Sequence, residues 1–146
     1  MKTPACLRMT ALLIAFLLPA VSAAGQPSGA DLSVTAQSAS LVLGESTACE
    51  DVRNGNSEQA AVAFSVELRR VYCYTNFTTV LEKSIAYHNW YLRDKMKASV
   101  KLTVRPPRWS TYSSIQLRDS EKGPWRVEVT DEEGNILRTL RFSVID

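Results

Sequence analysis

The sequence has only one histidine, which limits the chemistry that its side chains can perform. A structural zinc site needs four convergent ligands as a rule, and a catalytic one needs three plus an open position. His88 with Cys49 and Cys73 is the one set of that kind. The thiols of an exported protein, which the N-terminal signal described below predicts, tend to oxidise and would then not bind a metal. A serine hydrolase would have to use His88, but no Gly-x-Ser-x-Gly turn occurs. We therefore predict no metal site and no catalytic residue.

Glycine-rich phosphate loops and dinucleotide-binding fingerprints are also absent, so we predict no cofactor. Long apolar runs are absent as well, apart from a short one over residues 11–18. That run follows Lys2 and Arg8 and precedes small residues at Ala23 and Ala24, which is the pattern of a secretory signal over residues 1–24. Its length is well below the roughly 20 residues that span a bilayer, although an uncleaved anchor is the alternative. The expected product is periplasmic or secreted, with no transmembrane segment in the mature chain.

Net charge is lacking once the signal is removed. Two of the 17 basic residues lie in the signal and none of the 15 acidic ones, so the mature chain is formally neutral. A neutral chain has no basic field to attract nucleic acid, and we expect no nucleic-acid partner.

Cysteine is scarce, because only Cys49 and Cys73 remain after the signal is cleaved. Two thiols in an exported protein favour a disulfide between them. The alternative is that both are small buried apolar residues that do not meet.

Residues 25–45 are predicted to be a flexible lead-in, because Gly, Ser, Ala and Gln dominate its beginning. Residues 46–146 contain short β-branched and aromatic runs separated by turn signals. This pattern predicts one all-β domain, an antiparallel sandwich or barrel of about seven strands. The predicted strands cover residues 61–66, 70–77, 84–92, 96–104, 109–117, 124–130 and 136–145.

The period-two alternation in residues 84–92 predicts that His88 and Trp90 point into the core. We expect residues 70–77 to form a hairpin with residues 84–92, since that register keeps the apolar side chains of both strands on one side. A three-residue turn over 93–95 then places Met96 and Ala98 on the side of Trp90. A two-residue turn would instead set lysines against Trp90.

This arrangement predicts a polar face on the opposite side of the sheet, and tyrosines on such a face can bind a sugar ring or a protein. Ordinary cross-strand pairing, which needs no ligand, is the alternative explanation. The candidate ligand-binding residues are Arg70, Tyr72, Tyr74, Tyr87, Tyr91, Lys97 and Lys101.

Four segments together resemble a known family. They are "HNWY" (88–91), "RWSTYSS" (108–114), "GPWRVEVTDEEGNIL" (123–137) and "FSV" (142–144). In their order and spacing, residues from about Ala48 to Ile145 resemble the bacterial domain-of-unknown-function family 2914. The resemblance implies a small immunoglobulin-like β domain in the bacterial envelope, and it brings no assigned activity.

The expected function is therefore a non-catalytic binding or assembly module of the cell envelope, with a glycan or a protein as its partner. One alternative is a hydrolase of envelope glycans that uses a pair of loop carboxylates. Such pairs occur at residues 50–51, 119–121 and 131–133. The other alternative is a purely structural subunit of an envelope complex.

Overall fold

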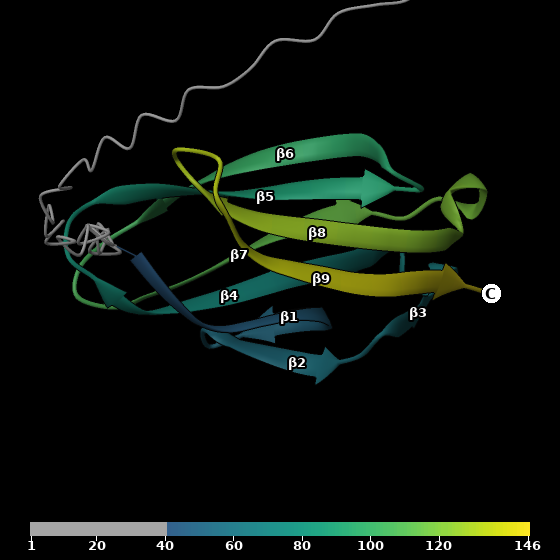
Figure 1. The fold of residues 1–146 in the computed structure, drawn as a ribbon. Coiled ribbons are helices and arrows are strands. Elements are labelled where there is room, and N and C mark those ends of the chain that lie inside the picture. The colour runs from purple at the N-terminus through teal and green to yellow at the C-terminus, as the bar shows by residue number, and fades with distance from the viewer. Residues whose placement is uncertain (1–40) are drawn as a thin grey trace, which may run out of the picture. The chain divides into compact units, whose positions relative to one another are not determined.

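The computed structural model describes residues 41–146, which form two β-sheets packed face to face (Figure 1). Sheet A has the order β2 (Asn56–Ala60), β1 (Leu41–Arg53), β4 (Arg70–Val80) and β7 (Trp109–Gln116). Sheet B has the order β3 (Ala63–Ser65), β9 (Ile136–Ile145), β8 (Gly123–Asp131), β5 (Ser84–Leu92) and β6 (Lys95–Val104). Two short 3-10 turns, η1 (Val66–Leu68) and η2 (Asp119–Glu121), complete the described elements.

These two sheets confirm the predicted immunoglobulin-like β-sandwich, with nine strands rather than about seven. Every neighbouring pair is antiparallel except β3 and β9, which run parallel. Residues 41–45, which composition assigned to the lead-in, belong to β1. In the described range, no helix is long and apolar enough to cross a membrane.

The predicted hairpin between residues 70–77 and 84–92 is wrong. β4 pairs with β1 and β7 in sheet A, whereas β5 pairs with β6 and β8 in sheet B. The apolar side chains of the two strands do share one region of space, but they meet across the core instead of side by side. Period-two alternation identifies the face that a strand buries and leaves its sheet undetermined.

The turn between β5 and β6 is shorter than predicted. Arg93 and Asp94 both have positive φ, at 46° and 63°, as the two central residues of a type I′ turn require. Trp90 nevertheless pairs with Ala98, because Tyr91 pairs with Met96 and Lys97 is the extra residue of a β-bulge. The bulge therefore corrects the register that a two-residue turn would otherwise impose. It also moves Met96, which is exposed, away from the side of Trp90.

The centre of the core is aromatic. Phe142 of β9 stacks on Trp125 with ring centroids 6.2 Å apart, and it meets Trp90 edge to face at 6.3 Å. Phe64 of β3 also meets Phe142 edge to face, with ring centroids 5.5 Å apart. Because Trp90 is fully buried, the prediction that it belongs to the core is confirmed.

His88 is also fully buried, and its ring joins the two sheets. Its Nδ1 lies 2.8 Å from the Ser113 hydroxyl of β7, and its Nε2 lies 3.2 Å from the Thr75 hydroxyl of β4. The indole N–H of Trp90 donates to the same Ser113 hydroxyl at 3.0 Å. Both ring nitrogens thus have hydroxyl partners, as expected for a histidine in the core.

The direction of these bonds follows from the donors that are present. The Trp90 indole can only donate, so Ser113 accepts from it, and a neutral His88 that carries its proton on Nε2 accepts at Nδ1 from the Ser113 hydroxyl. His88 Nε2–H then donates to Thr75, whose hydroxyl donates to the Thr111 carbonyl at 3.4 Å. Burial lowers the pKa of His88 from 6.5 to about 4.

The predicted disulfide is not formed, because Cys49 and Cys73 are both free and buried. In the register of β1 and β4, Cys73 pairs with Ala48 on the core side, and Cys49 pairs with Tyr72 on the opposite side. Their Cβ atoms therefore point away from each other, which a disulfide does not permit. Burial raises the pKa of both thiols, that of Cys49 to about 11.

The depressed pKa of His88 predicts a loss of stability in mild acid. As the pH falls from 6.5 to 4, the unfolded chain binds a proton that the folded chain does not. The free energy of unfolding should fall over this range by about 3 kcal/mol from this group alone. Urea unfolding at pH 7 and pH 4.5 would measure the loss. His88→Gln should be less stable at pH 7 and should lose less on acidification. An equal loss in both proteins would contradict the prediction.

Thiol titration tests the positions of the two cysteines. With Cys6→Ser in the full chain, unreduced protein should release two thiols on denaturation and almost none in the folded state, because both are buried and protonated. A chain without reactive thiols after denaturation would show that the disulfide forms after all.

Candidate functional site

The predicted binding face is divided between the two outer sides of the sandwich. Arg70, Tyr72 and Tyr74 lie on the outer side of sheet A, whereas Tyr87, Tyr91 and Lys101 lie on the outer side of sheet B. The prediction that these residues form one continuous surface is therefore wrong, because it depended on a hairpin between β4 and β5.

Lys97 belongs to neither group. As the bulge residue of β6, it reaches the edge of the sandwich, where its Nζ lies 2.7 Å from Oε1 of Glu121 in η2. The Glu121 side chain is almost completely buried, so this lysine neutralises a buried carboxylate.

The tyrosines of sheet A have structural partners. Tyr74 is buried and donates to the Ser110 hydroxyl of β7 at 3.2 Å. Tyr72 meets Tyr112 edge to face, with centroids 5.9 Å apart. These are the cross-strand pairs that stabilise a sheet without any ligand.

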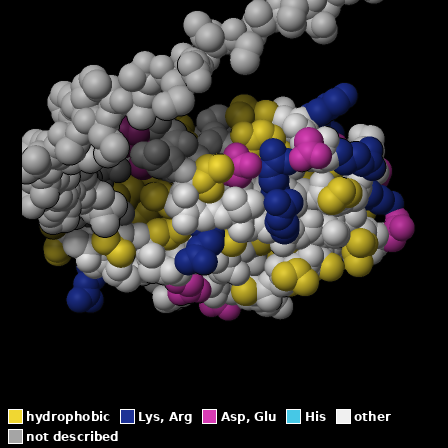
Figure 2. Space-filling view, viewed as in Figure 1, with side chains coloured by type: hydrophobic (Ala, Val, Ile, Leu, Met, Phe, Trp, Pro, Cys, Tyr) yellow, Lys and Arg dark blue, Asp and Glu magenta, His cyan; other side chains and the backbone are white. Residues whose placement is uncertain are grey.

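On sheet B, one row of side chains crosses three neighbouring strands. Arg141 of β9 pairs with Arg126 of β8, which pairs with Tyr91 of β5. The Arg126 guanidinium lies over the Tyr91 ring, 4.0 Å from its centroid. We call Arg141, Arg126 and Tyr91 the arginine–tyrosine row. Figure 2, seen from the side of β8 and β9, shows basic side chains beside acidic ones across this part of the molecule.

The two arginines of the row differ in their charge balance. Arg126 donates to Glu128 at 2.9 Å and forms a second ion pair with Asp94 of the turn. Within residues 41–146, Arg141 has no ion-pair or hydrogen-bond partner. Arg126 and Arg141 lie directly opposite each other, and like charges in that position destabilise a sheet. In the described part of the chain, only Arg126 of the two has a carboxylate counter-charge.

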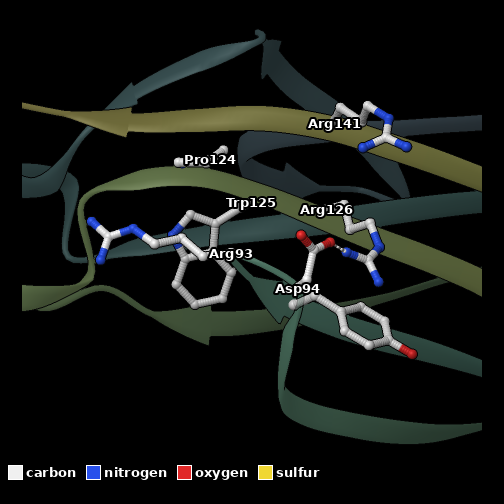
Figure 3. A pocket seen from close by; sticks show the side chains of 7 residues that line it. Arg93, Asp94, Pro124, Trp125, Arg126 and Arg141 are labelled. Atoms are coloured by element: carbon white, nitrogen blue, oxygen red, sulfur yellow. Dashed lines mark hydrogen bonds and ion pairs between the residues drawn. The ribbon is translucent and has the colours of Figure 1, made fainter.

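A shallow hollow lies beside the row. It has a volume of about 120 Å³ and is lined by Tyr91, Arg93, Asp94, Pro124, Trp125, Arg126 and Arg141. Figure 3 shows Asp94 and Arg126 directed toward one another in this hollow, with Arg141 on the neighbouring strand. Arg93 also lines the hollow, but its guanidinium is bound to the backbone, because it donates to the Lys122 carbonyl at 2.7 Å. Partial burial and the Glu128 carboxylate raise the pKa of Tyr91, so its phenol stays protonated at neutral pH.

The next row of sheet B holds the face in place. The Ser99 hydroxyl donates to Oδ1 of the Asn89 side chain at 2.6 Å, and Nδ2 of the same side chain donates to the Thr130 hydroxyl at 3.3 Å. These bonds connect β6, β5 and β8 on the outer side. The arginine–tyrosine row therefore stands on a sheet whose polar side chains are already hydrogen-bonded to one another. Such a surface can bind a rigid anionic group with little reorganisation.

Sequence reasoning did not select Arg126 or Arg141 as binding residues. Alternation in residues 124–130 did place Arg126 and Glu128 on the polar side of their strand. What was missing was the order of strands in sheet B, which brings β8 and β9 beside β5.

One carboxylate of each set considered for hydrolysis has a structural role. Asp51 accepts a hydrogen bond from Arg53 at 2.8 Å, which lowers its pKa. Asp131 accepts from the backbone and side chain of Asn135 within its turn. In the described part of the chain, no three His, Cys, Asp or Glu side chains come together as metal ligands would.

Comparison with solved structures gives one likeness to report. A β-glucosidase from Erythrobacter marinus has a region of similar shape, with a TM-score of 0.44 and 10% sequence identity. The alignment covers 72% of this chain and 15% of that enzyme, and at this TM-score it carries no functional information. No curated protein matches the sequence.

Comparison with protein families gives a match to the model described as "Protein of unknown function (DUF2914)" over residues 83–144. The match starts one residue before β5 and ends one residue before the end of β9, so it contains every residue of the arginine–tyrosine row. Residues 48–82, which the sequence resemblance included, lie outside it. Residues 83–144 therefore match the model of the DUF2914 family of proteins of unknown function, which supports the resemblance found in the sequence.

Proposed function

We propose that the protein is an exported, non-catalytic binding module of the bacterial cell envelope that recognises an acidic glycan through the arginine–tyrosine row. The observation that carries this proposal is the guanidinium of Arg141, which lies opposite Arg126, beside a hollow, and without a counter-charge among the described residues. A carboxylate of a sugar acid placed there would supply that charge.

The arginines that line the hollow support a carboxylate as the ligand. Arginine binds carboxylates through two parallel N–H donors, and such charge-assisted bonds are stronger than neutral ones. Tyr87 and Lys101 lie on the same outer side, one row beyond Asn89, where they could contact further sugar units. The predicted export, which rests on residues 1–24 outside the described range, would place this surface in contact with envelope polymers.

An acidic protein surface is the other partner that this chemistry would accept. A glycan is favoured because the volume of the hollow, about 120 Å³, suits one functional group better than a protein side chain with its backbone. Binding is preferred to hydrolysis because one carboxylate of each candidate set, Asp51, Glu121 or Asp131, is already bound by neighbouring side chains or backbone.

Binding of polygalacturonate, with neutral dextran as the comparison polymer, tests the proposal. The full chain should bind polygalacturonate and not dextran, and added salt should weaken the complex because the contact is electrostatic. Arg141→Gln should weaken binding about ten-fold, the effect of losing one charge-assisted hydrogen bond pair. Isothermal titration calorimetry gives both affinities.

Arg138→Gln is the matched control, because it removes the same charge from the same strand at a position on the other side of the sheet. It should bind within two-fold of the parent by the same measurement. Equal weakening by both variants would reveal a non-specific charge effect and reject the row as the site. Binding of an acidic protein but no acidic polysaccharide would reject the glycan.

A further inference from the structure

Each sheet has two edge strands, and three of the four are protected against pairing with another strand. β3 has only three residues, and β2 is short and polar. β6 is long, but it contains Lys95, Lys97 and Lys101 and the bulge at Lys97. Short length, lysines and bulges are the devices that keep an edge from pairing.

β7 has none of these protections. Its eight residues, "WSTYSSIQ", contain no charge and no proline, and its register with β4 runs without a bulge. Tyr112, at its centre, is 52% exposed. Among residues 41–146, no strand pairs with the outer side of β7.

The backbone groups that point outward can be identified. The Leu117 N–H donates to the Arg69 carbonyl on the β4 side, and the Thr111 carbonyl accepts from Thr75 of β4. Since alternate residues of an antiparallel strand direct their backbone groups to opposite sides, the even-numbered residues of β7 direct theirs away from β4. These residues are Ser110, Tyr112, Ser114 and Gln116.

A second hollow lies where a strand added to β7 would place its inward side chains. It has a volume of about 210 Å³ and opens between the edge strands β6 and β7. Ala98 and Ile115 give it apolar walls, and the Lys97–Glu121 ion pair closes it on the η2 side. A strand-addition site uses backbone bonds for affinity and such a pocket for alternate side chains.

The charges at the two ends of β7 indicate what the strand would be. Arg108 precedes it and Arg118 follows it, and both are exposed. In an antiparallel pair of two copies, Arg108 of one would lie close to Arg118 of the other, and these like charges would repel. A segment with an acidic residue at each end would instead neutralise both arginines.

We infer that β7 is a docking edge for an extended segment of a partner protein, uncharged along its length, acidic at both ends, and apolar where it enters the second hollow. The segment adds to sheet A as a fifth strand and bonds to the even-numbered residues of β7. This site is separate from the arginine–tyrosine row and does not rest on the proposed function.

The probe is a synthetic peptide of about ten residues, with alternating valine and threonine and a glutamate at each end. Hydrogen exchange followed by NMR on the full chain gives the readout for each amide. Without peptide, the amides of Ser110, Tyr112, Ser114 and Gln116 should exchange fast, and those of Thr111 and Ser113 slowly. With peptide, the four fast amides should become protected. No gain of protection at these four, or a gain at β6 instead, overturns the inference.

Ser114→Pro removes an outward N–H without breaking a bond to β4, so the sandwich should keep its melting temperature within a few degrees. Peptide affinity should fall about ten-fold or more. Ser114→Ala keeps the N–H and should bind as the parent does. Equal binding by both variants would overturn the inference. So would sedimentation that shows a dimer whose four amides are already protected without peptide, because the occupant would then be a second copy.

Discussion

The hydrogen-bond chain through His88 is the interaction that fixes how the two sheets face each other. Trp90 and His88 come from β5 in sheet B, while Ser113 and Thr75 come from β7 and β4 in sheet A. Apolar side chains can repack when one sheet slides over the other, and the cost is modest as long as volume is kept. Polar groups in a dry core have no such freedom, because a slide that separates them leaves each one without a partner. These hydrogen bonds through His88 therefore select one alignment of sheet A relative to sheet B.

This constraint also positions both candidate surfaces. Because the side chains of a strand alternate, an inward His88 requires an outward Tyr91, which then forms the end of the arginine–tyrosine row. In β7 the same rule applies to Ser113. Its side chain points inward to His88, so the residues on either side of it, Tyr112 and Ser114, present their backbone groups to the free edge. Neither surface is adjacent to His88, yet the orientation of each follows from it.

The sequence was sufficient to identify the strands from residue 61 onward, their buried faces and the core position of His88 and Trp90, because these depend on local alternation. It missed β1 and β2, which lie in a polar segment without clear alternation. It was insufficient for the partners of each strand. Residues 70–77 and 84–92 bury matching apolar sides whether they lie side by side or meet across the core, so the tyrosines of β4 were wrongly joined to those of β5. The predicted disulfide between Cys49 and Cys73 was wrong for a related reason. Their number favoured a disulfide, but the register of β1 and β4 directs them to opposite sides.

The turn between β5 and β6 links the two candidate surfaces physically. A two-residue turn puts Asp94 beside Arg126, where its carboxylate balances one of the two arginines, while Arg141 has no carboxylate partner among residues 41–146. That turn alone would shift the register of β6 by one residue and bring lysines toward Trp90. The bulge prevents this by leaving Lys97 unpaired in the ladder between β5 and β6. The Lys97 ammonium group then closes the second hollow together with Glu121. One local choice of turn thus determines the charge of the first hollow and the wall of the second. A change in the length of this turn would alter both, even though it touches neither Arg141 nor β7.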